Sequence, residues 1–166
     1  LRETGEVLDL GRVHERAACG QLTGEHDGRE AGAGQGASGC PDATVWSGVL
    51  HDPYTGSAVS FQRGQSTSDA VQIDHIIPLK YAWMHGADKW SQETREQYAN
   101  DPDVLVAADG PANAAKGAKG PSQWEPENKS YTCQYAKDWL KIADKYNLSV
   151  DQADADWLSD TISSCM

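Results

Sequence analysis

The chain has 166 residues, a formal net charge of −11 and a hydrophobic content of 39%. These values suit one folded domain with a sizeable core and exclude wholesale disorder. The acidic balance argues against a protein that coats nucleic acid through a broad basic surface, whereas a catalyst needs only a local basic patch. No stretch approaches the roughly 20 apolar residues of a membrane helix, so no membrane association is expected.

The first 39 residues differ in composition from the rest of the chain. Apolar residues scattered among charges predict a helical opening over residues 1–18. Residues 20–39 are rich in glycine and poor in apolar side chains, which indicates a loop that adds little to a core. We assign residues 1–39 to the same domain as residues 40–166, because apolar patterning resumes directly after the loop.

Three strands are predicted in the first half of the chain. Residues 47–61 read as two strands joined by an Asp-Pro-Tyr-Thr-Gly turn, since proline fixes φ and glycine accepts a positive φ. A third strand is predicted over residues 71–77, where β-branched residues surround Asp74 and His75.

The following segment predicts a helix, a strand and a second helix. The helical pattern runs over residues 83–98, with Ser91 as N-cap. The apolar run 104–108 predicts a strand that pairs with the preceding one. An Asp-Gly-Pro start signal then predicts a brief helix that carries Asn113 and ends at Gly117. This order of elements would bring Asn113 towards Asp74.

Two apolar stripes at helical spacing follow, and we interpret them as core-packing helices. They comprise Tyr135, Trp139, Leu140, Ala143 and Tyr146, and then Trp157, Leu158, Thr161, Ile162 and Cys165. Residues 113–145 hold six lysines and four acids, so positive charge is concentrated after Asn113. The alternative is that these lysines are ordinary solvated helix faces.

The four cysteines lack the C-x-x-C spacing of zinc sites, and their even number suggests two disulfides. Three pairings are possible. We favour Cys19 with Cys40, which would close the glycine-rich loop, and Cys133 with Cys165, which would clamp the C-terminal segment. Disulfides imply an oxidising, extracellular destination. The alternative is four separate buried thiols in a cytoplasmic protein.

The pair Asp74-His75 carries the strongest chemical signal. On a strand, adjacent side chains point to opposite faces, which sets a metal ligand beside a general base. Imidazole suits the role of base because its ordinary pKa of about 6.5 leaves it mostly neutral at physiological pH. Such a pair suits a metal-assisted phosphodiesterase. Asp-His dipeptides are common, so the hypothesis depends on the segments around this pair.

Those segments resemble the HNH branch of the His-Me finger (ββα-metal) endonucleases. The chain is most similar to small secreted bacterial HNH nucleases, which share their domain with the C-terminal part of GmrSD-type restriction enzymes. The resemblance spans about residues 40–140, and residues 1–39 contribute almost nothing to it. It is carried by residues 73–79, 98–105 and 110–117, and by the flanking segments 47–56, 63–64 and 131–135.

The resemblance implies an α+β fold with a ββα-metal core, additional strands and C-terminal helices. It makes His75 the general base, and Asp74 and Asn113 the ligands of one divalent ion. Hard oxygen ligands favour Mg²⁺, with Mn²⁺, Ca²⁺ and Zn²⁺ as alternatives. Arg63 and Lys116 are expected to contact the substrate, and Lys116, taken as an exposed lysine, can equally have no role.

One position departs from the family pattern. Members commonly carry an asparagine that braces the backbone of the catalytic histidine, and this chain has Val104 there. Asn100, four residues earlier, is the candidate to supply the bracing. If nothing supplies it, His75 would be less well oriented and activity would be weak.

We therefore predict a secreted, monomeric endonuclease that hydrolyses phosphodiester bonds of DNA, and of RNA as a further substrate, with little sequence specificity. A rival hypothesis is a catalytically degenerate His-Me finger that binds a metal, a polyanion or a protein without cleaving. A second rival is an enzyme that acts on another phosphodiester or on a small phosphate ester.

Overall fold

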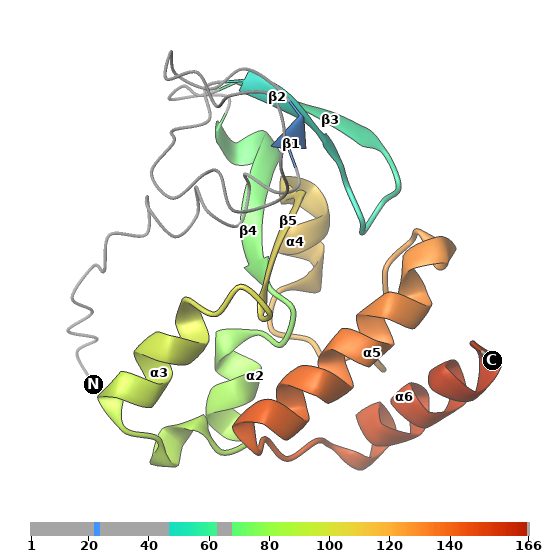
Figure 1. Ribbon diagram of the computed structural model, residues 1–166. Helices are drawn as coiled ribbons and strands as arrows, with labels where there is room; N and C mark the ends of the chain where they lie inside the picture. Colours follow the sequence, from blue (N-terminus) through green and yellow to red (C-terminus); the bar gives the residue numbers. More distant parts are fainter. Residues whose placement is uncertain (1–21, 24–46, 63–67, 166) are drawn as a thin grey trace, which may run out of the picture.

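The computed structural model describes residues 22–23, 47–62 and 68–165 (Figure 1). The predicted opening helix, Cys19, Cys40 and Arg63 lie outside the described residues, and so does the predicted glycine-rich loop except for Leu22 and Thr23. The loop prediction is wrong at these two residues, because their main chain pairs with Leu50 and Val49 as a short strand. In that part of the chain, no helix is both long and apolar enough to span a bilayer. The described part combines small antiparallel sheets with helices, so the fold class is α+β, as predicted.

The first sheet contains β1 (Leu22–Thr23), β2 (Ser47–His51) and β3 (Ala58–Gln62), antiparallel in that order. The turn between β2 and β3 is closed by main-chain hydrogen bonds between Asp52 and Ser57 and between Gly56 and Asp52. Gly56 has a φ of 77°, a region that glycine enters without steric cost. The predicted hairpin is confirmed.

The second sheet is an antiparallel pair of β4 (Val71–His75) and β5 (Leu105–Asp109), preceded by the short helix η1 (Ser68–Ala70). Asp74 lies opposite Val106, and His75 lies opposite Leu105. The predicted pairing of these two strands is confirmed.

Helix α4 (Gly110–Lys116) continues directly from β5 and packs on both strands of the pair. The side chain of Asp109 caps it by accepting a hydrogen bond from the Ala112 amide at 3.0 Å. Proline fits the first turn, where its missing N–H has no helical partner. The helix ends at Gly117, which has a φ of 53°. These bounds match the prediction.

The excursion between β4 and β5 contains α2 (Leu79–Met84), η2 (Ala87–Lys89) and α3 (Gln92–Ala99). The helical pattern predicted over residues 83–98 is interrupted, because the chain turns at Gly86, whose φ is 131°. Helix α3 begins as expected, since the Ser91 hydroxyl accepts from the Thr94 amide at 3.1 Å.

Helices α5 (Lys129–Tyr146) and α6 (Gln152–Ser164) run side by side after the sheets (Figure 1). A disulfide joins Cys133 near the start of α5 to Cys165 just after α6, as predicted. Asn147 ends α5 in the left-handed conformation, which asparagine tolerates better than most residues.

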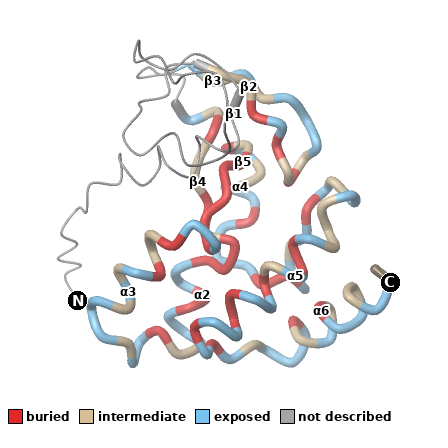
Figure 2. The backbone as a smooth tube through the Cα atoms, viewed as in Figure 1, coloured by how far each residue is buried: buried red, intermediate tan, exposed pale blue. Residues whose placement is uncertain are grey.

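The main core lies where α5 meets the second sheet and the excursion (Figure 2). Its largest fully buried side chains are Trp139, Tyr54, Tyr98 and Tyr135. The apolar stripe of α5 faces this core, with one exception. Leu140 is 45% exposed, so its predicted place in the core is wrong. Most of the other apolar residues of the two helical stripes are buried in this core or pack against it.

Candidate active site

Asp74 and His75 lie together at the C-terminal end of β4. Directly after β4, the Ile76 amide donates a hydrogen bond to the Val104 carbonyl at 2.8 Å. Side chains alternate along a strand, and the contacts follow that rule. Asp74 contacts Tyr54 and α4, whereas His75 contacts α3. The two groups are therefore held from different sides of one strand end.

The carboxylate of Asp74 is buried and accepts two strong donors. Oδ2 accepts the Tyr54 hydroxyl at 2.5 Å and the Lys116 ammonium at 2.7 Å. Asp74 retains only 7% of its accessible surface. Burial, and then the nearby charge of Asp74, raises the pKa of Tyr54 well above its ordinary value, so the phenol keeps its proton and donates.

Lys116 bridges the two residues of the Asp-His pair. Its ammonium reaches the Asp74 carboxylate and also donates to the main-chain carbonyl of His75 at 2.8 Å. The expectation of an exposed lysine is wrong, because Lys116 is 0% exposed. Burial lowers the pKa of Lys116, and the carboxylate of Asp74 opposes that shift. The predicted phosphate contact of Lys116 stays a prediction.

Asn113 lies on α4 one turn before Lys116, and it also faces β4. Its amide Nδ2 donates to Oε1 of Gln72 at 2.9 Å. Gln72 and Asp74 are two residues apart on the strand, so they share one face. Asn113 and Asp74, the predicted metal ligands, thus belong to the same α4–β4 interface.

The ring of His75 is oriented by α3. Nε2 lies 3.0 Å from the carbonyl oxygen of Ala99, and because a carbonyl can only accept, Nε2 carries the proton. In the neutral ring the basic lone pair is then on Nδ1. The ring is also nearly parallel to that of Tyr98, with centroids 6.3 Å apart.

The bracing predicted for Asn100 has a different origin in the structure. Asn100 is the C-cap of α3, and its side chain donates to the Glu96 carbonyl at 2.6 Å. The contact with the imidazole comes from the main chain of Ala99, the preceding residue. The main chain of His75 is held by strand pairing and by Lys116.

A buried carboxylate also ties the hairpin turn to α4. Asp52 is 1% exposed, and its Oδ1 accepts from the main-chain amide of Asp109 at 2.9 Å. Its Oδ2 accepts from the amide and the hydroxyl of Thr55. Asp52 therefore links the loop that carries Tyr54 to Asp109, the residue that caps α4. Helix α4 in turn carries Asn113 and Lys116.

The α4–β4 interface offers oxygen donors, and it does so without a cluster of acidic or histidine side chains. Among residues 22–23, 47–62 and 68–165, no group of three or more His, Cys, Asp or Glu residues gathers at a metal-binding spacing. The α4–β4 interface instead offers the oxygens of one carboxylate, Asp74, and of the amides of Asn113 and Gln72. Oxygen donors of this kind suit a hard cation that keeps several waters or binds substrate phosphate, such as Mg²⁺. The donor set fits such an ion.

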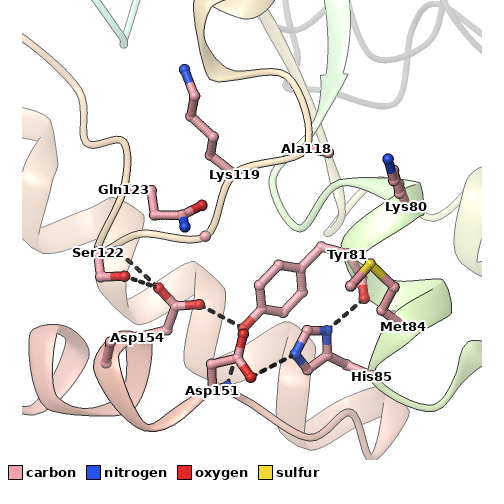
Figure 3. A pocket seen from close by; sticks show the side chains of 12 residues that line it. Lys80, Tyr81, Met84, His85, Ala118, Lys119, Ser122, Gln123, Asp151 and Asp154 are labelled. Atoms are coloured by element: carbon pink, nitrogen blue, oxygen red, sulfur yellow. Dashed lines mark hydrogen bonds and ion pairs between the residues drawn. The ribbon is translucent and has the colours of Figure 1, made fainter.

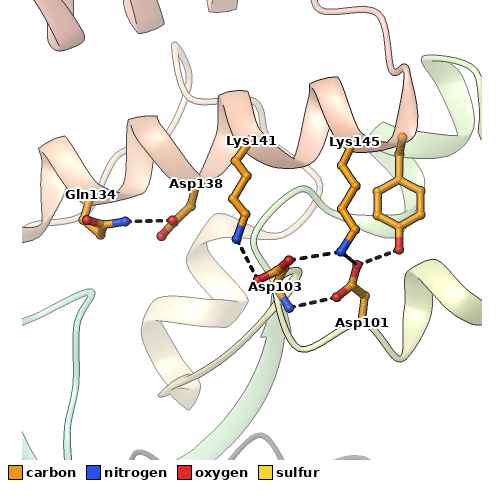
Figure 4. Close-up of polar contacts among 7 residues, drawn as sticks. Asp101, Asp103, Gln134, Asp138, Lys141 and Lys145 are labelled. Atoms are coloured by element: carbon orange, nitrogen blue, oxygen red, sulfur yellow. Dashed lines mark hydrogen bonds and ion pairs between the residues drawn. The ribbon is translucent and has the colours of Figure 1, made fainter.

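The positive charge predicted after Asn113 is largely neutralised in the structure. Lys141 and Lys145 of α5 pair with Asp103 at 2.8 and 3.0 Å, and Lys145 also pairs with Asp101 at 2.7 Å (Figure 4). Lys129 pairs with Glu125 at 2.6 Å. The predicted basic patch is therefore wrong for these lysines, because Glu125 and two acids that precede the counted segment, Asp101 and Asp103, neutralise them.

A hollow of about 420 Å³ lies between α2, the segment after α4, and the start of α6 (Figure 3). Asp154 is 3% exposed and accepts from the Tyr81 hydroxyl, the Ser122 amide and the Ser122 hydroxyl. The ring of His85 stacks on Tyr81, and its Nε2 lies 3.4 Å from Asp151. These contacts hold α6 against the segment after α4, which is a structural role.

Comparison with known proteins identifies the family of the chain. Residues 38–161 match the model of the GmrSD restriction endonuclease C-terminal domain. The chain belongs to this family. The match includes β4, β5 and α4, and therefore Asp74, His75, Asn113 and Lys116.

The chain is also similar to a protein of Arthroderma benhamiae that is named an uncharacterized secreted protein. The two sequences are 37% identical over 122 residues, which is 72% of this chain. The chain spans 56% of the length of that relative.

Sequence reasoning missed two partners of the Asp-His pair in this GmrSD C-terminal domain. In the sequence Tyr54 reads as a turn residue, although a tyrosine between a Pro and a Thr-Gly can also reach inward. Ala99 acts through its carbonyl, for which no side-chain signal exists. For Lys116 a signal was present, because it lies three residues after Asn113 and so on the same helix face.

Proposed function

We propose that this chain is a metal-dependent endonuclease of the ββα-metal type that hydrolyses phosphodiester bonds of DNA, with RNA as a further substrate. Membership of a restriction endonuclease family supports nuclease chemistry. The pair β4–β5 followed by α4 supports the proposal, because two antiparallel strands and a following helix are the elements that such a core requires. The observation that carries the proposal is the position of His75 beside Asp74, with Nε2–H donated to Ala99.

In this proposal His75 is the general base. Because its Nε2 proton is held by a carbonyl, Nδ1 accepts the proton of the attacking water. The stacked ring of Tyr98 and the Ala99 carbonyl fix the plane of the imidazole, which reduces the rotational freedom lost when substrate binds. Departure of the 3′ oxygen then leaves products with a 5′ phosphate.

Asp74 and Asn113 would hold one divalent ion, with Mg²⁺ the first choice. When bound, such an ion stabilises the negative charge that builds on the phosphate and on the leaving oxygen. Tyr54 and Lys116 would fix the Asp74 carboxylate through Oδ2. Arg63 is proposed, as from the sequence, to contact the substrate.

Secretion forms part of the proposal. The Cys133–Cys165 disulfide favours an oxidising compartment, and the relative from Arthroderma benhamiae is named a secreted protein. We further propose that the protein acts as a monomer and that residues 1–39 belong to the same domain as the rest.

The test is digestion of supercoiled plasmid by the protein and by His75→Ala, in Mg²⁺, Mn²⁺, Ca²⁺ or Zn²⁺ and with chelator. We expect metal-dependent nicking that falls by about 10²–10⁴-fold in the variant, the usual contribution of a general base. His51→Ala is the matched control, because His51 is exposed on β2. Chelator-resistant nicking, or equal rates for His75→Ala and the parent protein, would contradict the proposal.

The ion pair between Lys116 and Asp74 favours one alternative, a degenerate domain that binds polyanions without cleaving. In that case Lys116 would permanently take the place of the metal beside Asp74. Intact plasmid in every metal, together with retained DNA binding in a gel-shift assay, would support this alternative. Rates on RNA, single-stranded DNA and a chromogenic phosphodiester then define the substrate class of an active protein.

A further inference from the structure

The Lys116–Asp74 ion pair brings no net charge to the proposed metal site. The side chain of Lys116 is 0% exposed and that of Asp74 is 8% exposed, so water screens neither charge well. The charges lie 2.7 Å apart and cancel formally. The other donors at this interface, Asn113 and Gln72, are neutral amides.

Other carboxylates lie near this interface but are engaged elsewhere. Asp52 uses both oxygens for main-chain and hydroxyl donors of Thr55 and Asp109. Asp109 caps α4 through Oδ2. Neither is placed by these contacts to replace the charge that Lys116 removes from Asp74. A divalent ion at Asp74 and Asn113 would therefore meet one carboxylate whose charge is already balanced.

We infer that Lys116 is a built-in counter-charge that keeps the affinity of the free protein for divalent ions low and makes metal binding depend on the substrate phosphate. This inference rests on the proposed function and adds a rule for how its site is loaded. A phosphodiester carries the negative charge that the protein site lacks. Metal and nucleic acid then bind together, each raising the affinity for the other by the same factor, as linkage requires.

Lys116 is also a positioning residue for the Asp-His pair. One ammonium holds the side chain of Asp74 and the carbonyl of His75, so its loss frees both residues of the strand end. Removing the charge should thus tighten metal binding and slow cleavage. A purely structural role would weaken both, and this divergence separates the two interpretations.

The experiment measures Mn²⁺ binding by isothermal titration calorimetry in the His75→Ala background, which prevents cleavage. The full chain is titrated alone and with a saturating duplex oligodeoxynucleotide. Lys116→Met is compared with Lys119→Met, which removes an equal charge from an exposed lysine bonded to the Ala115 carbonyl.

We expect Lys116→Met to tighten the Mn²⁺ dissociation constant of the free protein by at least about tenfold, since a buried charge next to the ion is removed. Lys119→Met should change it by less than about threefold, because screening weakens exposed charges. With Lys116 present, the oligodeoxynucleotide should tighten Mn²⁺ binding by about tenfold or more, and in Lys116→Met this gain should shrink.

Unchanged or weaker Mn²⁺ binding in folded Lys116→Met would overturn the inference. If that variant does not fold, as judged by circular dichroism, equal Mn²⁺ affinity with and without oligodeoxynucleotide in the parent background overturns it instead. Asp74→Asn separates this failure from that of the proposed function. If Asp74→Asn leaves Mn²⁺ binding in the presence of DNA unchanged, the proposed metal site itself is wrong.

Discussion

The hydroxyl of Tyr54 donates to Oδ2 of Asp74 over 2.5 Å, and this bond ties the turn between β2 and β3 to the end of β4. The ring of Tyr54 is fully buried and packs edge-on against Trp124 and Tyr135. The hairpin thus reaches the Asp-His pair through a polar contact that is set inside an aromatic cluster. The orientation of Asp74 depends on the hairpin as well as on its own strand.

Tyr54→Phe is expected to lower the free energy of unfolding by about 1.5–3 kcal/mol, because a buried hydrogen bond to a charged acceptor is lost. Urea unfolding followed by fluorescence measures this change. Tyr131→Phe is the matched control, since its hydroxyl lies 3.5 Å from Asp138 at the limit of hydrogen bonding. Equal destabilisation by the two substitutions would show that the Asp74 contact has no special weight.

Acid is expected to weaken the contact between α5 and the loop before β5. Burial raises the pKa of Asp101, but hydrogen bonds from Lys145, Tyr146 and the Asp103 amide outweigh it, so the pKa lies below its ordinary value. A carboxyl whose pKa is lower in the folded chain than in the unfolded chain stabilises the fold. This stabilisation is present at pH values above the pKa of the unfolded chain. That contribution is lost as pH falls through the folded value.

Asp101→Asn should therefore destabilise the protein at pH 7 and lose less stability than the parent on acidification to about pH 3. Urea unfolding at the two pH values measures the difference. Asp144→Asn, on the exposed face of α5, should behave like the parent protein. If Asp101→Asn loses as much stability as the parent on acidification, the ion pair between Asp101 and Lys145 in Figure 4 does not control the acid response.

Local patterns in the sequence predicted the elements that carry the site. β-branched residues around Asp74 predicted β4, and the Asp-Gly-Pro signal predicted α4 down to its end at Gly117. Both depend on interactions within a few residues, which sequence patterns record well. The helical pattern predicted over residues 83–98 is interrupted at Gly86, which takes a positive φ. The spacing of apolar residues carries no information about a turn of the backbone at one residue.

Contacts between distant segments were not predictable in the same way. Tyr54 meets Asp74 across 20 residues, and Lys116 meets it across 42 positions of the numbering. Lysine is rarely buried without a partner, so its default interpretation is a solvated side chain. Only the fold supplies Asp74 as that partner. The carbonyl of Ala99 carries no sequence signal, because every residue has one.

The disulfide between Cys133 and Cys165 is expected to contribute about 3–4 kcal/mol, because it closes a loop of 32 residues in the unfolded chain. Cys133→Ser with Cys165→Ser should lower the urea midpoint accordingly. The effect belongs to stability, since the bond joins α5 to the end of α6 and does not contact Asp74 or His75 in the described contacts. A stability equal to that of the parent protein would refute the expected contribution.

Gly120 and Asp154 approach so closely that a side chain at position 120 cannot fit. A Cβ on Gly120 would lie 2.1 Å from Oδ2 of Asp154, the oxygen that accepts the Tyr81 hydroxyl. Gly120→Ala is expected to cost about 2–4 kcal/mol, because Asp154 must move away from its buried donors. Asp154→Ala should also destabilise the protein, since it leaves those donors unsatisfied.

The two substitutions should not be additive. Once Asp154→Ala has removed the carboxylate, Gly120→Ala meets no oxygen, so its added cost should fall below about 1 kcal/mol in a double-mutant cycle. Urea unfolding of the four proteins measures the coupling. Additive costs would mean that Gly120 is needed for its own backbone conformation and not because of the close approach of Asp154.

Plasmid nicking by the folded variants should stay near the parent rate. The residues around the hollow in Figure 3 hold α6 in place, and they do not contact the Asp-His pair in the described contacts.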